Sequence, residues 1–235
     1  MPQIPQIPRR KLNRIARETA ILKAALEVFS QAGFSGATME AVALSAGISK
    51  PTLYQYFDNK TALFDAMMQS KRLQMALAID LPADGDMVAQ LYRFCMGYAR
   101  TVMRPDMLSL ARLIIGEAQR FPEIGRAYQA AGPDKLLDDI TQYLAARQTA
   151  GHLSFDDARM AAEDLWGLVL SAPRTRALHD PAITYSEDEL QGFVHSGLKV
   201  FLRAYSTRVS ADLTRLSDCI GAAPKAQEHL EKRSE

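Results

Sequence analysis

The segment from Thr38 to Phe57 restricts the fold of this chain more than any other, because it predicts two short helices joined by a tight turn. Thr38 favours the N-cap position, and apolar residues follow at the spacing of one helix face: Met39, Val42, Ala43 and Ala46. Gly47 stands where the chain has to turn, and glycine adopts a positive φ without steric cost. Ser49 caps a second helix, in which Leu53 and Phe57 face inward. Two helices around a glycine turn, the second with an outer polar face, are typical of a helix-turn-helix that reads DNA in the major groove.

The second of these helices carries side chains that suit contact with a DNA duplex. Gln55 offers a donor and an acceptor to a base edge, with adenine as the favoured partner, and Lys50 can reach guanine or a phosphate. The hydroxyl groups of Tyr54 and Tyr56 suit phosphate oxygens, although Tyr54 could instead pack on the preceding long helix. Lys60 follows in the first turn of the next helix, where exposed N–H groups favour an anion. We therefore expect a DNA-contacting set of Thr38, Ser49, Lys50, Pro51, Thr52, Tyr54, Gln55, Tyr56 and Lys60.

Basic residues are concentrated toward the N-terminus. Residues 1–72 hold 10 Lys and Arg against 5 Asp and Glu, a net +5, whereas the remaining residues hold 18 against 22, a net −4. This distribution fits one DNA-facing module on a larger part that does not touch DNA, with ordinary charge fluctuation as the alternative. Prolines at positions 2, 5 and 8 predict an extended, mobile arm over residues 1–13. Four basic residues of this region could follow the DNA backbone or enter the minor groove, or could simply be solvated: Arg9, Arg10, Lys11 and Arg14.

The N-terminal third resembles a known family. From about Arg14 to Met68 the sequence is similar to the DNA-binding domain of the TetR/AcrR family of bacterial transcriptional regulators. Thr38 and five short runs carry the resemblance: AALEVF at 24–29, GF at 33–34, AGIS at 46–49, TLYQYF at 52–57 and NK at 59–60. The resemblance implies that six positions lie at the DNA interface: Lys50, Thr52, Tyr54, Gln55, Tyr56 and Lys60. A shorter stretch, residues 111–131, resembles the effector domain of AefR-like members.

The predicted fold class is all-α. Residues 14–72 are expected to form the helix-turn-helix domain, and a linking helix that opens near Asp58 joins it to a larger helical domain over residues 73–207 for effector binding and dimerisation. Patterns of the capping-box form at Ser154 and Ser186 predict helix starts there. Residues 208–235 turn polar, and we expect a partly disordered tail in which a short amphipathic piece can form around Leu213 and Leu216.

The larger domain is rich in Met and aromatic residues, a composition that suits an adaptable apolar pocket. The family resemblance implies that such a pocket takes a small-molecule effector, without indicating which one. For each candidate a plain core position is the alternative. The expected lining residues are Phe94, Tyr98, Met103, Met107, Ile114, Phe121, Tyr128, Trp166 and Leu170.

The last long helix, over residues 190–205, is apolar on more than one face, so we expect it to pack on its own core and on a second surface. The family resemblance implies a four-helix dimer interface formed by the last two helices of each subunit. The expected dimer residues are Ala158, Ala162, Leu165, Leu190, Val194, Gly197 and Phe201.

Sequence patterns of enzymes do not occur in this chain. Its four histidines lack metal-ligand spacing, and there is no glycine-rich phosphate loop or nucleophile elbow, so we expect no catalytic residue, metal or cofactor. Without a signal peptide or an apolar run of roughly 18 residues, a cytoplasmic protein without membrane association is expected. The sequence thus predicts a homodimeric repressor that a small apolar effector releases from a palindromic double-stranded DNA operator. An activator, an effector-independent DNA binder and a small-molecule-binding protein with an inert helix-turn-helix remain open as alternatives.

Overall fold

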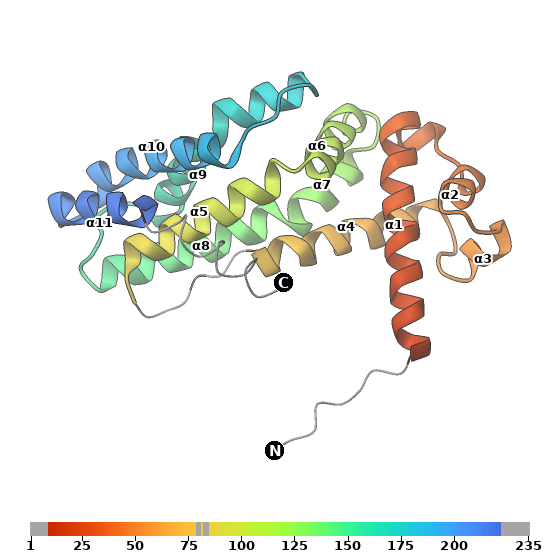
Figure 1. The fold of residues 1–235 in the computed structure, drawn as a ribbon, viewed down its shortest axis with the longest axis horizontal. Helices are drawn as coiled ribbons and strands as arrows, with labels where there is room; N and C mark the ends of the chain where they lie inside the picture. The colour runs from red at the N-terminus through yellow and green to blue at the C-terminus, as the bar shows by residue number, and fades with distance from the viewer. Residues whose placement is uncertain (1–8, 79–80, 82–84, 222–235) are drawn as a thin grey trace, which may run out of the picture. The chain divides into compact units, whose positions relative to one another are not determined.

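A computed structural model describes residues 9–78, 81 and 85–221, and these residues form eleven helices without a named strand (Figure 1). The predicted all-α fold is confirmed. The helices are α1 Arg9–Gly36, α2 Met39–Ser45, α3 Lys50–Tyr54, α4 Lys60–Ala78, α5 Met87–Val102, α6 Pro105–Glu117, α7 Pro122–Ala131, α8 Pro133–Thr149, α9 Ala158–His179, α10 Glu187–Tyr205 and α11 Val209–Gly221.

The chain divides into two compact units. In the part that the structure describes, the head comprises residues 9–74 and 109–131, and the body comprises residues 75–108 and 132–221. The first division falls within α4 and the second within α6. The sequence predicts instead that all of 73–207 forms one domain. The α6–α7 segment joins the head because its apolar residues share one core with the N-terminal helices: Leu110, Leu113, Ile114 and Ile124.

The helix-turn-helix of the head forms at the predicted caps and turn. Thr38 Oγ1 accepts a hydrogen bond from the Ala41 N–H at 3.1 Å and so caps α2. Gly47 has a φ of +65°, and Ser49 Oγ accepts from the Thr52 N–H at 3.3 Å at the start of α3. Leu53 is fully buried. The local signals in the sequence therefore determine how the two short helices begin and how the turn between them is made.

Helix α1 is longer at its N-terminal end than the sequence predicts. It begins at Arg9, so the predicted extended arm is wrong for residues 9–13, whereas residues 1–8 lie outside the described part. No proline follows position 8 in this region, and Arg, Lys and Leu are good helix formers, which explains the early start. Near its other end, Gly33 interrupts the helix with a φ of +70°.

The body is a bundle in which α5, α8, α9, α10 and α11 share one apolar core. Helices α9 and α10 approach closely at Gly197, where an added Cβ would lie 2.7 Å from the carbonyl oxygen of Leu168. The capping box at Ser186 is confirmed, because its hydroxyl accepts from the Glu189 N–H and the Glu189 carboxylate accepts from the Ser186 N–H.

Residues 209–221 form α11, which contains the amphipathic piece expected around Leu213 and Leu216 and belongs to the body core. A disordered tail is therefore wrong for this stretch. Leu216 is fully buried, and the buried Asp212 accepts a hydrogen bond from the Ser206 hydroxyl at 2.6 Å. Arg215 forms an ion pair with Asp86, the N-cap residue of α5. A few apolar residues at helical spacing were sufficient to attach a mostly polar helix. Residues 222–235 lie outside the described part.

Candidate nucleic-acid interface and ligand pocket

Helix α3 presents its polar side chains outward because its one buried residue, Leu53, fixes the opposite face in the core. Most of the predicted contact residues are exposed on α3 and its caps, with Thr52 and Tyr56 half-buried: Ser49, Lys50, Pro51, Tyr54 and Gln55. Tyr54 keeps 42% of its surface exposed, so part of its ring is available to a partner. The set remains a prediction for DNA contact, with a geometry that allows it.

Lys50 and Glu40 form an exposed ion pair between α3 and α2. The hydrogen bond between them raises the pKa of the Lys50 ammonium and lowers the pKa of the Glu40 carboxyl. The Lys50 ammonium also lies 5.9 Å from the centre of the Tyr54 ring. In the free protein, the cation expected to meet guanine or phosphate is therefore partly neutralised by a neighbouring carboxylate.

Lys60 makes contacts that the sequence does not predict. Its ammonium donates hydrogen bonds to the carbonyl oxygens of Phe34 at 2.6 Å, Ser35 at 3.1 Å and Ala37 at 3.1 Å. These bonds engage all three N–H donors, so this geometry differs from the expected phosphate contact. The carbonyl groups at the end of α1 attract the cation, as carbonyl groups at a helix C-terminus generally do.

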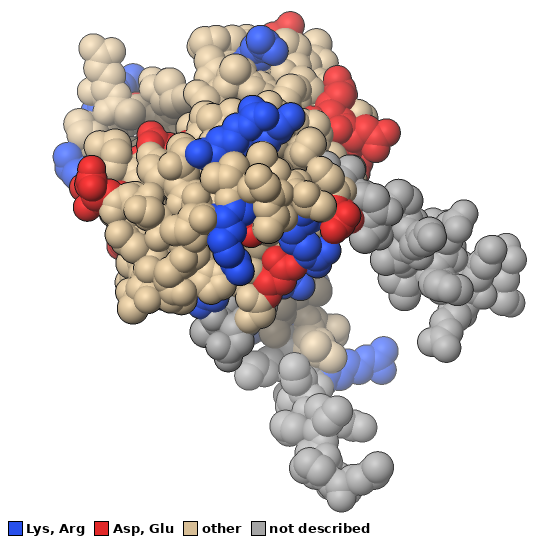
Figure 2. Space-filling model, turned by 90° about the vertical axis from the view of Figure 1, so that its left-hand side faces the viewer, with Lys and Arg blue, Asp and Glu red and all other residues tan. Residues whose placement is uncertain are grey.

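A groove in the head runs between α1 and the turn of the helix-turn-helix. Asn13, Arg14 and Arg17 line one side, and residues 46–48 with Tyr56 line the other. The Arg14 guanidinium lies 5.9 Å from the centre of the Tyr56 ring. The structure thus brings the predicted DNA residues Arg14 and Tyr56 together. Arg14 lies within α1, whereas the sequence predicts that it follows directly on an extended arm. By contrast, the face of the body in Figure 2 mixes acidic and basic side chains over a mostly uncharged surface, without a continuous basic patch.

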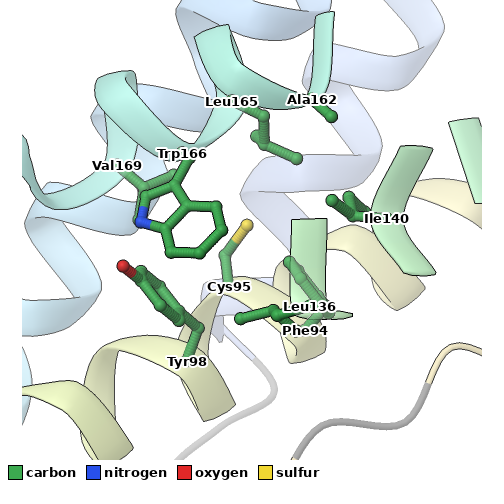
Figure 3. A pocket seen from close by; sticks show the side chains of 9 residues that line it. All are labelled: Phe94, Cys95, Tyr98, Leu136, Ile140, Ala162, Leu165, Trp166 and Val169. Atoms are coloured by element: carbon green, nitrogen blue, oxygen red, sulfur yellow. The ribbon is translucent and has the colours of Figure 1, made fainter. Parts of the chain in front are cut away.

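The body contains a small apolar pocket between α5, α8 and α9 (Figure 3). Its empty volume is about 280 Å³, including space open to solvent, whereas its interior has room for about one water molecule, about 10 Å³. The rings of Tyr98 and Trp166 meet edge to face with their centres 5.2 Å apart. Burial raises the pKa of the Cys95 thiol, which keeps it protonated and apolar in character. The lining residues are Phe94, Cys95, Tyr98, Leu136, Ile140, Ala162, Leu165, Trp166 and Val169.

Only part of the predicted pocket set lies together. Phe94, Tyr98 and Trp166 line the pocket, whereas Met103, Met107 and Leu170 belong to the body but do not line it. The other three predicted residues lie in or against the core of the head: Ile114, Phe121 and Tyr128. An abundance of Met and aromatic residues does not indicate which helices pack together, so it could not separate these two groups.

The predicted dimer residues face the interior of the body and not an outer surface. Six of the seven are buried within the body, and Ala158 is half-buried: Ala162, Leu165, Leu190, Val194, Gly197 and Phe201. The exposed apolar residues on the same helices are Met160 and Leu168 on α9 and Val200 on α10, with 56%, 40% and 46% of their surface exposed. Small exposed residues accompany them: Gly167, Ser171, Gly192 and Ser196. Helices α9 and α10 thus have a second, exposed apolar face, but their most regular apolar stripe faces the core of the body.

Two family models match this chain. A model described as the AefR-like transcriptional repressor C-terminal domain matches residues 89–207, about half of the chain, and a model of bacterial regulatory proteins of the tetR family matches residues 21–67. This chain belongs to the TetR family. The first of these TetR-family matches includes the residues of the apolar pocket and both candidate dimer helices, and the second includes the helix-turn-helix.

Individual TetR-family relatives match different lengths of the chain. RutR of Escherichia coli strain K12 is a transcriptional regulator that is 31% identical over 134 residues, 56% of this chain and 56% of RutR. The chain therefore spans only about half the length of that relative. FasR of Mycolicibacterium smegmatis, a transcriptional activator, is 44% identical over 59 residues, 25% of this chain and 27% of FasR. The solved structure of the flavonoid-responsive regulator FrrA is 28% identical with a TM-score of 0.67, covering 82% of this chain and 98% of FrrA.

Two further observations concern metal binding and membrane spans. Within the described residues, no group of three or more His, Cys, Asp or Glu side chains is placed to hold a metal ion. None of the helices in the described ranges combines the length and the apolar character that crossing a bilayer requires.

Proposed function

We propose that this TetR-family protein is a DNA-binding transcriptional repressor, active as a homodimer, which a small apolar ligand releases from its operator. The observation that carries the proposal is the capped helix-turn-helix, in which α3 points Lys50, Tyr54 and Gln55 outward from a buried Leu53. A reading helix must be held rigidly at its base while its outer face remains available to the groove. Here Ser49 and the Gly47 turn supply the rigid base.

The dimer is proposed on the exposed face of α9 and α10 around Leu168 and Val200. Apolar side chains flanked by glycine and serine allow two helix pairs to approach closely and bury the exposed area. A two-fold dimer would present one α3 per half-site, so the expected operator is a palindrome with half-sites one or more helical turns apart.

The ligand is proposed to enter between α5, α8 and α9, beside Tyr98 and Trp166. Aromatic edges and an apolar lining favour an aromatic ligand with few polar groups, and the response of the related FrrA to flavonoids supports this class. Because the pocket interior holds only about one water molecule, binding requires its side chains to move apart. That movement gives the ligand a preference for one form of the protein, which any release from DNA requires.

An activator is the second candidate, favoured by one observation: 59 residues of this chain are 44% identical to part of the activator FasR. A helix-turn-helix fixes where a protein binds on DNA and not the sign of its effect on transcription. A reporter gene behind the selected operator separates the two, because deletion of a repressor raises expression and deletion of an activator lowers it.

DNA binding is tested by selecting duplexes from a random-sequence library with the full-length protein. Recovery of a palindrome, protected symmetrically in footprinting, is expected. Selection of no sequence would support the inert helix-turn-helix alternative, and a single asymmetric half-site bound by a monomer would refute the dimeric arrangement.

Ligand release is tested with a panel of flavonoids and simple aromatic acids, read out by quenching of Trp166, the only tryptophan. The matched control is Trp166→Phe, which should bind the same compounds without the signal when followed by thermal shift. The affinity of a true effector should fall when the selected duplex is present, by the factor that corresponds to a coupling of about 1–3 kcal/mol. Equal affinity with and without the duplex would exclude release by that compound.

A further inference from the structure

A carboxylate from α6 holds the segment between the kink of α1 at Gly33 and the N-cap of α2, residues 33–37, which we call the α1–α2 loop although residues 34–36 form the last turn of α1. The Phe34 N–H donates a hydrogen bond to Glu117 Oε1 at 2.9 Å. The same oxygen lies 2.4 Å from the place where a Cβ on Gly33 would be, so the carboxylate fills the space that glycine leaves open. Glu117 is the last residue of α6 and is 83 positions away from Phe34 in the sequence.

Lys60 holds the same residue of the loop from α4. Its ammonium donates a hydrogen bond to the Phe34 carbonyl oxygen at 2.6 Å and lies 4.8 Å from the centre of the Phe34 ring. The N–H and the C=O of Phe34 are therefore bonded to opposite charges on two different helices. Hydrogen bonds to charged groups are stronger than those between neutral groups, so both attachments resist movement of the loop.

The Phe34 side chain fixes the loop in a third way. Its ring centre lies 5.6 Å from that of Phe29 on α1, 5.3 Å from that of Phe64 on α4 and 5.5 Å from that of Phe121, just before α7. The contacts with Phe64 and Phe121 are edge to face, an arrangement that tolerates little sliding. The α6–α7 segment thus contacts the loop at two points, through the Glu117 carboxylate and through the Phe121 ring.

The loop leads directly into the DNA-reading helices. Ala37 is buried and is followed by Thr38, the N-cap of α2. Helix α2 has seven residues and α3 has five, with only residues 46–49 between them. Elements this short contain little that could absorb a displacement, so a shift of the loop would be passed on to α3.

We propose that Glu117 is a positioning residue for DNA binding, which sets the orientation of α2 and α3 by holding the Gly33–Phe34 corner of the loop. This inference rests on the proposed DNA-binding function. Helix α6 begins at Pro105, in the stretch assigned to the body, and ends at Glu117 in the head. Glu117 touches no DNA in this proposal and acts only through Phe34.

If Glu117 acted only through its charge, its removal would change DNA affinity in the opposite direction. Any carboxylate on a DNA-binding unit repels phosphates, so removal of a negative charge should tighten binding. Removal of a positioning contact should weaken binding although the charge becomes more favourable. Glu123, an exposed carboxylate in the first turn of α7 in the same unit, provides a matched control for the charge.

The test compares Glu117→Ala, Glu117→Gln and Glu123→Ala in the full-length protein, with a duplex that the wild-type protein selects from a random library as the probe. We expect about tenfold weaker binding for Glu117→Ala, a smaller loss for Glu117→Gln, which keeps an acceptor oxygen, and wild-type or slightly tighter binding for Glu123→Ala. The salt dependence of binding should stay unchanged in all three, because no phosphate contact is lost. Amide hydrogen exchange at Phe34 should become at least about tenfold faster in Glu117→Ala only.

Equal or tighter binding by Glu117→Ala, or wild-type exchange at Phe34, would overturn the proposal. If Glu117→Ala does not fold, Glu117→Gln decides by binding: weaker binding with an unchanged salt dependence supports the proposal, and equal or tighter binding refutes it. If the wild-type protein selects no duplex, the proposed DNA-binding function fails and the positioning role fails with it. The exchange at Phe34 then still shows whether Glu117 holds the loop.

Discussion

Replacement of Gly33 by alanine should destabilise the head more than the same replacement at Gly47. Both glycines have a positive φ, +70° and +65°. A positive φ in the left-handed helical region costs a residue with a Cβ about 1–2 kcal/mol. Gly33 also has a ψ of 170°, in a region that is essentially restricted to glycine, where the cost is about 1–3 kcal/mol. At Gly47 no atom lies within 4 Å of the added Cβ, so this conformational cost is the whole effect. At Gly33 the Cβ would stand 2.4 Å from Glu117 Oε1 and displace it.

The displaced carboxylate can no longer accept the hydrogen bond from the Phe34 N–H. Hydrogen bonds to charged groups contribute about 1.5–3 kcal/mol, and Glu117 is half-buried, so we take the lower part of this range. Gly33→Ala should therefore cost at least about 3 kcal/mol in unfolding free energy, more than Gly47→Ala.

A double-mutant cycle isolates the contact. In a Glu117→Ala background there is no carboxylate to displace, so Gly33→Ala should cost only its conformational part, about 1–3 kcal/mol. Urea unfolding followed by far-UV circular dichroism measures these differences, while the fluorescence of Trp166 reports separately on the body. Equal costs for Gly33→Ala in the two backgrounds would refute the reasoning.

Four other perturbations have defined outcomes. Gln55→Ala should relax base preference at one operator position at a cost of about 1–3 kcal/mol, as measured by repeating the duplex selection. Glu40→Gln should release Lys50 and tighten binding to the selected duplex severalfold, most clearly at low salt. Leu168→Glu should give monomers in analytical ultracentrifugation, because it places charge on an exposed apolar face of α9. Burial raises the pKa of Tyr143 to about 12 from 10, so its neutral phenol stabilises the fold below pH 10 and this contribution is lost as the pH rises toward 12. Tyr143→Phe should remove that part of the alkaline decline and, since the phenol donates to Gln90 Oε1 at 2.6 Å, cost about 1 kcal/mol at neutral pH in urea titrations.

Features that depend on neighbouring residues in the sequence could be predicted, and features that depend on which helices meet could not. The caps at Thr38, Ser49 and Ser186 and the turn at Gly47 each involve groups within a few positions of one another. A side-chain oxygen that bonds to an N–H three residues away is specified by the local sequence alone. The helix-turn-helix and the all-α class follow from such signals.

The role of Lys60 illustrates the limit. In the sequence it stands in the first turn of a helix, which favours an anion nearby, but the packed structure brings the end of α1 within its reach. The same limit applies to Glu117, for which the sequence contains no signal because its partner is 83 positions away. The same limit applies to the predicted dimer residues. The sequence contains an apolar stripe, but the most regular part of that stripe faces the core of its own subunit.

The head is an interrupted domain, and this matters to anyone who would graft its DNA-reading helices onto another regulator. A fusion made after residue 74 would carry α1 to α3 and most of α4 but omit residues 109–131. The graft would lose Leu110, Ile114 and Phe121, whose apolar surfaces complete the core around Phe34 and Phe64. A transplantable module must therefore combine both stretches, for example by replacing the matching hairpin of the recipient together with its N-terminal helices.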